Sequence, residues 1–340
     1  MRNALLALVL AATGLLVPSA HASPSPVPVI YDSDLDVDDA STLAYLCVQH
    51  QEKRIDLRAV TVTHNGFGTP GRARQHAISV LEQCGLPGVP VAEGSDTGVH
   101  PAPASTVRDM EEVLTGALGD AGRTPPPSDR TAAQLISQTL AQARGKVSVL
   151  VTGPLSNLAK AVPPGSPLAR KVAVAHVMGG AVHVPGNLFG EALPGFDNSQ
   201  ELNIWLDPPS ARRAFGTVPV RLTPLDATNH VLITQAYVDR VGAEGTTPSA
   251  RLVHSIMTQP IMRDGIALQY FYWWDALAAV WAFDNDGVVS DVRRTPIVVV
   301  QQGEQSGRTA PWPWGDRLTV AFDADPARFE QVFLDGLNGK

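Results

Sequence analysis

Short runs of β-branched and apolar residues alternate along the chain with longer stretches in which apolar residues recur every three or four positions. The short runs predict strands and the longer stretches predict helices. Strands are expected at 28–32, 57–63, 89–94, 146–153, 172–180, 219–225, 296–302 and 317–322. Helices are expected at 39–51, 70–84, 131–144, 154–162, 207–215, around Asp275 and at 326–337. This alternation predicts an α/β fold with an open, mostly parallel sheet flanked by helices.

Two long segments show neither the strand pattern nor the helical pattern. Residues 102–130 are rich in proline, glycine and charge, which predicts a surface excursion, and residues 183–200 read as a long polar loop. We find neither an internal repeat nor a clean linker. Residues 23–340 are therefore predicted to form a single domain.

The N-terminus has the pattern of a secretory signal. Arg2 precedes an apolar run at 4–17, and the small-residue triplet 20–22 follows. The run is shorter than the roughly 20 apolar residues that a membrane span needs. We expect cleavage of residues 1–22, a mature chain that begins at Ser23 without a membrane span, and a secreted or otherwise extracytoplasmic location.

Composition limits the partners. The 340 residues are 44% hydrophobic, enough for a large core, and the net charge of -7 offers no basic field for a phosphate backbone. A nucleic-acid polymer is therefore excluded as a partner, and a neutral small molecule fits better.

The only two cysteines, Cys47 and Cys84, each end a predicted helix. They form either a disulfide or two small core residues, and the sequence leaves both open.

An acidic cluster lies between the first predicted strand and the first predicted helix. Five carboxylates fall within eight residues, at Asp32, Asp34, Asp36, Asp38 and Asp39. Like charges this close raise one another's pKa, and a bound cation relieves their repulsion. Carboxylate oxygens are hard ligands, which favours Ca²⁺ or Mg²⁺.

The cluster also has other interpretations. Asp38 and Asp39 open a helix, where negative charge favours the helix dipole, and a solvated acidic loop needs no metal. An EF-hand is excluded because a strand precedes the cluster rather than a helix. Phosphotransferases of the haloacid dehalogenase type also begin with a strand and two aspartates, but they need a hydroxyl residue where Asp36 stands.

Further polar residues follow other predicted strands. Asn65 follows the second strand, Thr152 ends a later one, and 187–203 follow the next. Open α/β sheets bind ligands at the carboxyl ends of their strands. The sequence therefore places the binding site at this edge.

The run DSDLDVDDA at 32–40 resembles the DxDxGxDDA signature of the inosine-uridine preferring nucleoside hydrolases. Further motifs resemble that family in the same order: TVTHNG at 61–66, VTGPLSNLA at 151–159, MGGAVHVPGN at 178–187, ELNIWLDP at 201–208, PLDAT at 224–228, WDALAA at 274–279 and the ending at 317–337. The resemblance covers nearly the whole predicted mature chain. It implies the Rossmann-like nucleoside hydrolase architecture and hydrolysis of ribonucleosides to ribose and free base.

The resemblance also implies roles for individual residues. A calcium ion would be held by the carboxylates of Asp34, Asp39 and Asp275 and the main-chain carbonyl of Thr152, with Asp34 as the general base toward a calcium-bound water. The implied ribose-binding residues are Asp38, Asn65, Asn187, Glu201 and Asn203. Glu201 and Asn203 lie two positions apart, and we expect both side chains on one face of an extended segment.

Three departures from the family pattern concern the nucleobase. Asp36 stands where many members have glycine, and the segment between Asn187 and Glu201 is longer, which predicts a different lid over the base. Trp274 stands where several members carry a histidine. Its indole would stack best on a purine, so purine nucleosides are favoured, although Trp274 could equally belong to the core.

A second hypothesis comes from another functional class. The expected secretion and the departures around the nucleobase favour an extracellular calcium-dependent protein that binds ribose or nucleosides with little turnover. Retention of the residues implied around the water favours the hydrolase. The sequence leaves open whether the chain forms a homo-oligomer.

Overall fold

The structure is a computed structural model, and it describes residues 25–188 and 197–340. The expected signal peptide (1–22) and most of the expected lid (189–196) lie outside the described residues. Within the described part, no helix is both long and apolar enough to cross a membrane.

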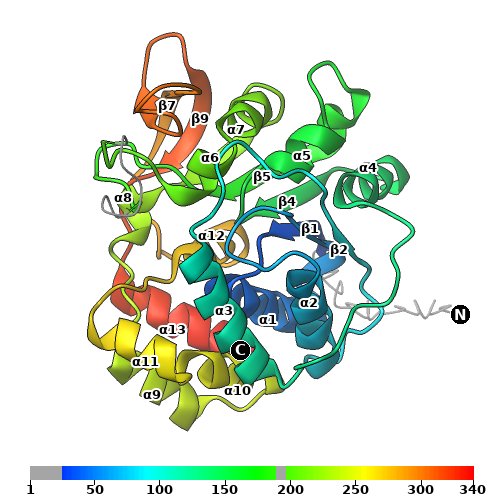
Figure 1. The fold of residues 1–340 in the computed structure, drawn as a ribbon, viewed down its shortest axis with the longest axis vertical. Coiled ribbons are helices and arrows are strands. Elements are labelled where there is room, and N and C mark those ends of the chain that lie inside the picture. The colour runs from blue at the N-terminus through cyan, green and yellow to red at the C-terminus, as the bar shows by residue number, and fades with distance from the viewer. Residues whose placement is uncertain (1–24, 189–196) are drawn as a thin grey trace, which may run out of the picture.

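A nine-stranded sheet runs through the described residues in the order β3-β2-β1-β4-β5-β6-β9-β7-β8 (Figure 1). Neighbours from β3 to β9 are parallel, and β7 is antiparallel to both β9 and β8. The strands are β1 (Val27–Ser33), β2 (Ile55–Val62), β3 (Val91–Glu93), β4 (Val147–Val151), β5 (Val172–Met178), β6 (Val220–Thr223), β7 (Val292–Val299), β8 (Thr309–Pro311) and β9 (Asp316–Ala321). The predicted open, mostly parallel α/β sheet is confirmed.

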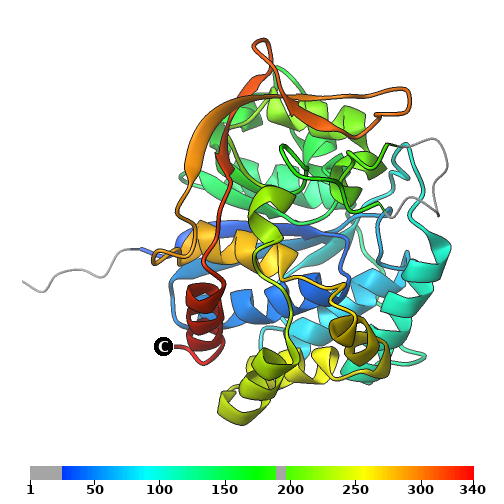
Figure 2. The same ribbon diagram turned by 90° about the vertical axis from the view of Figure 1, so that its left-hand side faces the viewer.

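Helices cover both faces of the sheet (Figures 1 and 2). One face packs on α1 (Val37–Gln51), α2 (Arg72–Gln83), α12 (Trp274–Phe283) and α13 (Pro326–Leu337), and the other on α4 (Ala132–Gln142), α5 (Ser156–Ala161) and α7 (Pro208–Phe215). The central strand β1 alternates between two cores, because Val29 and Tyr31 face the first layer and Ile30 faces the second. Both faces of β1 are buried, as in other parallel sheets.

The segment 102–130 corrects the expectation of a plain surface excursion. It contains α3 (Ala104–Leu118), whose buried residues Met110, Val113, Leu114 and Leu118 recur at helical spacing. The flanking prolines and glycines obscure this periodicity in the sequence. The sequence pattern also leaves unassigned α9 (Gln235–Glu244), α10 (Pro248–Met257) and α11 (Pro260–Ala267), which pack on one another beside α3. The remaining short helices are η1 (Pro167–Lys171), α6 (Leu202–Leu206) and α8 (Leu225–Thr228).

Cys47 at the end of α1 and Cys84 after α2 lie side by side, as the neighbouring helices predict. Both are buried free thiols, and the Cys84 sulfur lies 3.2 Å from the Ser249 hydroxyl.

Candidate active site

A tight turn joins β1 to α1 and gathers the acidic cluster. Leu35 adopts a left-handed φ of 57°, and the next residue, Asp36, is the N-cap of α1. The Asp36 carboxylate accepts hydrogen bonds from the main-chain N–H groups of Asp38 (3.1 Å) and Asp39 (3.5 Å). In return, the Asp39 carboxylate accepts from the N–H of Asp36 at 3.1 Å. This capping box wraps the aspartates around the start of α1.

The carboxylates of the turn meet that of Asp275 at the start of α12. Oxygens of Asp36, Asp38 and Asp275 all lie within 4.8 Å of one another, and so do oxygens of Asp34, Asp36 and Asp39. The N–H of Asp275 also donates to Asp38 at 3.3 Å. None of the ion pairs within residues 25–188 and 197–340 involves these five side chains. Asp36, whose role the sequence leaves open, therefore belongs to both groups of oxygens.

Burial without counter-charge perturbs the protonation of the cluster. Desolvation, followed by the charge of neighbouring aspartates, raises the pKa of Asp34, Asp38 and Asp275 well above its ordinary value. The pKa of Asp39 rises to about 6, because burial and the Asp36 charge outweigh hydrogen bonds from Thr152 and Tyr31. Buried carboxylates with no cationic partner among the described residues form a site that suits a metal ion, and an all-oxygen donor set suits a hard one.

Thr152 ties the cluster to the neighbouring strand. Its hydroxyl donates to Asp39 at 2.5 Å, and its main-chain carbonyl accepts from the Asn203 amide at 2.9 Å. The backbone also approaches Asp34 closely, since a Cβ on Gly66 would lie 2.3 Å from the Asp34 Cβ. Gly66 has a φ of +131°, so both space and conformation require glycine in the TVTHNG motif.

Glu201 begins the short helix α6. Its carboxylate accepts from the N–H groups of Asn203 (3.0 Å), Ile204 (3.1 Å) and Gly180 (2.8 Å). The expected extended segment at 201–203 is therefore wrong, because the Glu201 side chain caps a helix that contains Asn203. The Asn187 side-chain oxygen accepts from the N–H of Leu202 at 2.9 Å, which fixes the preceding loop against α6.

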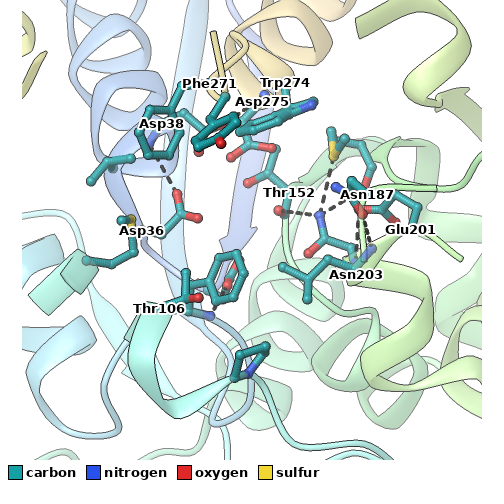
Figure 3. A pocket seen from close by; sticks show the side chains of 18 of the residues that line it. Asp36, Asp38, Thr106, Thr152, Asn187, Glu201, Asn203, Phe271, Trp274 and Asp275 are labelled. Atoms are coloured by element: carbon teal, nitrogen blue, oxygen red, sulfur yellow. Dashed lines mark hydrogen bonds between the residues drawn. The ribbon is translucent and has the colours of Figure 1, made fainter. Parts of the chain in front are cut away.

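A cavity of about 550 Å³ opens over these groups. Asp36, Asp38 and Asp275 face Asn187, Glu201 and Asn203 across it, and Trp274 and Phe271 form an adjoining wall (Figure 3). Of the residues expected at the site, the cavity is lined by Asp34, Asp38, Thr152, Asn187, Glu201, Asn203, Trp274 and Asp275. Residues from five separate segments of the sequence thus meet at the carboxyl edge of the sheet.

Two expected site residues do not line the cavity. Asp39 lies behind Asp34 and is fully buried, although it belongs to the carboxylate cluster. Asn65 is buried against Gly98 of the loop that leads to α3, and neither polar atom of its side chain has a hydrogen-bond partner among the described residues. Its expected contact with ribose remains a prediction. Asn157, on α5, donates to Asp32 at 2.9 Å.

The structure separates the roles of two adjacent tryptophans. Trp273 is fully buried in an aromatic cluster with Tyr237 and Phe333, whereas Trp274 lines the cavity and contacts the Tyr272 ring at 5.5 Å. Trp274 is therefore a wall residue, and stacking on a base remains a prediction.

Sequence reasoning missed part of the cavity wall. The lining residues that it did not single out include Phe67, Pro103, Ser105, Thr106, Met110, Tyr270 and Phe271. Thr106 and Met110 lie four positions apart on α3, so a search for helical periodicity within 102–130 would have found this face.

Comparison with known proteins agrees with the geometry. The family model of the inosine-uridine preferring nucleoside hydrolases matches residues 29–331. Uridine nucleosidase 1 of Arabidopsis thaliana is 30% identical over 190 residues, which make up 55% of this chain and 52% of that protein. The pyrimidine-specific ribonucleoside hydrolase RihA of Salmonella enteritidis is 28% identical over 68% of this chain and 70% of that protein. The match thus spans between 52% and 70% of the length of these curated relatives.

Solved structures share the fold. An inosine-uridine preferring nucleoside hydrolase from Bacillus anthracis superposes with a TM-score of 0.79 at 22% identity, over 92% of this chain and 100% of that one. A purine-preferring ribonucleoside hydrolase from Gardnerella vaginalis gives 0.72 at 21% identity, over 92% and 98%. Since the family model covers residues 29–331 and the fold agrees, the chain belongs to the inosine-uridine preferring nucleoside hydrolases and is an enzyme of that class.

Proposed function

We propose that the protein hydrolyses the N-glycosidic bond of ribonucleosides, with purine nucleosides preferred, at a calcium site formed by Asp34, Asp39, Asp275 and the carbonyl of Thr152. The observation that carries this proposal is a buried carboxylate cluster without counter-charge that opens into a cavity of about 550 Å³. The opposite wall supplies Asn187, Glu201 and Asn203, which suit sugar hydroxyls.

The residues present fit a calcium ion. When bound, calcium would acidify a water molecule and offset the repulsion among the carboxylates. Asp34 is oriented for proton acceptance, because its Oδ2 accepts from the N–H of Phe67 at 2.5 Å. In its ionised form Asp34 takes a proton from the water that attacks C1′, and Asp38 accepts from the ribose 2′-hydroxyl.

The walls around the base support the purine preference. Trp274 offers an indole face, and its Nε1 has no hydrogen-bond partner among the described residues. Stacking of a base on an aromatic ring stabilises binding by roughly 1–3 kcal/mol and grows with ring area. The indole carries no useful acid, so the departing purine would take its proton from water.

The experiment measures release of reducing sugar and kcat/KM for inosine, guanosine, uridine and cytidine, with and without chelator. We expect turnover that calcium restores, a purine preference in the parent, and a smaller preference in Trp274→Ala with unchanged calcium affinity. Trp312→Ala, at an exposed indole outside the cavity, is the matched control. A parent that prefers uridine would refute the base assignment. Binding of nucleosides without sugar release would favour the binding-protein hypothesis instead.

We also propose that the protein is exported. The support is the sequence pattern of residues 1–22, and cell fractionation with N-terminal sequencing of the mature chain tests it.

A further inference from the structure

Helix α3 connects the cavity to a second cluster of charged side chains. Its first half contributes Ser105, Thr106 and Met110 to the cavity wall. Its N-cap, Pro103, makes no side-chain capping bond. The next residue after Met110 is Glu111, which faces away from the cavity toward α2. The position of the wall therefore depends in part on how α3 is attached to α2, on the side opposite the cavity.

A buried histidine makes that attachment. His76 of α2 is 1% exposed, and its Nδ1 lies 2.9 Å from the Oδ2 of Asp120, which follows α3 and is fully buried. Its Nε2 lies 3.1 Å from the Oε2 of Glu111. Arg72 spans the same two carboxylates, with Nε 2.8 Å from Glu111 Oε1 and a terminal nitrogen 3.0 Å from Asp120 Oδ1.

These contacts define the protonation state of His76. An ionised carboxylate only accepts hydrogen bonds, and a neutral imidazole has a single N–H to donate. Both ring nitrogens of His76 face carboxylate oxygens, so with both carboxylates ionised the two contacts form only with the imidazolium. Two cations, His76 and Arg72, then balance the two anions, Glu111 and Asp120, and the buried network is neutral overall.

The other groups around His76 agree with this assignment. Burial alone would raise the pKa of Glu111, but hydrogen bonds from His76 and Arg72 outweigh it and lower that pKa to about 2. Ser79 of α2 donates to Asp120 at 2.8 Å, and the Arg123 guanidinium lies 3.4 Å from the Ser79 hydroxyl. The charged groups that face His76 from α2, α3 and the following turn are therefore Arg72, Glu111, Asp120 and Arg123.

We propose that protonated His76 is a positioning residue that holds α3 against α2 and thereby sets the fit of the nucleobase. This inference rests on the proposed function, in which the α3 wall meets the base. When His76 loses its proton, one ring nitrogen presents a lone pair to a carboxylate, and α3 loosens. The carboxylate cluster lies on α1 and α12, so nucleoside KM rises while kcat is preserved.

The first variant removes the imidazolium. His76→Gln cannot donate to both carboxylates, and we expect KM for inosine to rise about tenfold with kcat within about twofold of the parent. The matched control is His230→Gln, at a half-exposed histidine that lies 3.6 Å from a single carboxylate, Asp323, and this control keeps the parent KM. Amide hydrogen exchange across residues 104–118 should be faster in His76→Gln, and this measurement needs no turnover.

The second variant allows a neutral His76 to keep both of its contacts. In Glu111→Gln the amide oxygen still accepts from Arg72, while the amide nitrogen replaces Oε2 and donates to neutral His76. In the parent, KM should rise as the pH is increased and His76 loses its proton, and in Glu111→Gln this rise should disappear.

Parent KM and parent amide exchange in His76→Gln would overturn the proposal, and so would the same pH-dependent rise in Glu111→Gln. If the protein cleaves no nucleoside, the proposed function fails, and the exchange of 104–118 still decides the role of His76.

Discussion

Replacement of Glu201 by glutamine tests whether this residue supports the fold as well as the sugar. The carboxylate accepts three main-chain hydrogen bonds, at 2.8, 3.0 and 3.1 Å, and it is 1% exposed. A glutamine amide has one accepting oxygen. If this oxygen takes the place of Oε2, it keeps the bonds from Gly180 and Ile204, but the NH₂ group then faces the N–H of Asn203, donor against donor.

The magnitude follows from the lost bond. A hydrogen bond to a charged group contributes roughly 1.5–3 kcal/mol, and the two remaining bonds weaken because their acceptor becomes neutral. We therefore expect Glu201→Gln to lower the free energy of unfolding by about 3 kcal/mol. Urea unfolding followed by circular dichroism measures this, with Glu52→Gln at an exposed position as control. A Glu201→Gln protein within about 1 kcal/mol of the parent would refute the capping role and leave Glu201 as a ligand residue only.

Three further predictions concern the carboxylates and a buried histidine. Asp34→Asn should lower kcat by roughly 10²- to 10⁴-fold while substrate still binds, and a near-parent rate in steady-state kinetics would reject Asp34 as the base. Asp39→Asn should weaken calcium binding in calorimetry by at least about tenfold, and unchanged affinity would reject the ligand set. His176 is buried near Arg221, and burial followed by that charge lowers its pKa from 6.5 to about 3. Below pH 6.5 the unfolded chain therefore binds a proton that the native state does not, and stability falls as the pH drops toward 3. At pH 5 the loss is about 2 kcal/mol, so His176→Leu should show a smaller difference in urea stability between pH 7 and pH 5 than the parent does.

Most of the sheet could be predicted from the sequence because its strands are buried on both faces. Runs such as 28–32 and 146–153 are rich in apolar and β-branched residues, and this composition is visible without knowledge of the packing. Helix α3 escaped prediction for the opposite reason. Its buried face is narrow, and the prolines and glycines on either side of 104–118 dominate the local composition.

The part of the site whose residues are close together in the sequence could be predicted. The aspartates of the β1–α1 turn are close in sequence, so their clustering needs no tertiary information. Asn65 shows the limit of this reasoning, because its motif is intact and yet the loop at Gly98 covers its side chain. The role of Asp36 as N-cap was also hidden, since a capping carboxylate and a ligand carboxylate look alike in sequence.

The two sides of the cavity differ in how they are built. The sugar side is held by main-chain contacts. Glycines such as Gly66 and Gly153 lie directly against Asp34, where a Cβ would clash, and both carboxylate oxygens of Glu201 accept hydrogen bonds from main-chain N–H groups. The base side consists of the residues before α12, which make main-chain hydrogen bonds to Val231 and Ile233, and of α3, which is attached to α2 by side-chain contacts such as His76 with Glu111. Side-chain contacts can be exchanged without refolding the backbone, whereas the glycine contacts cannot. If the proposed function holds, we expect substitutions in the attachment of α3 and at Trp274 to alter the choice of base while the carboxylate side of the site stays intact.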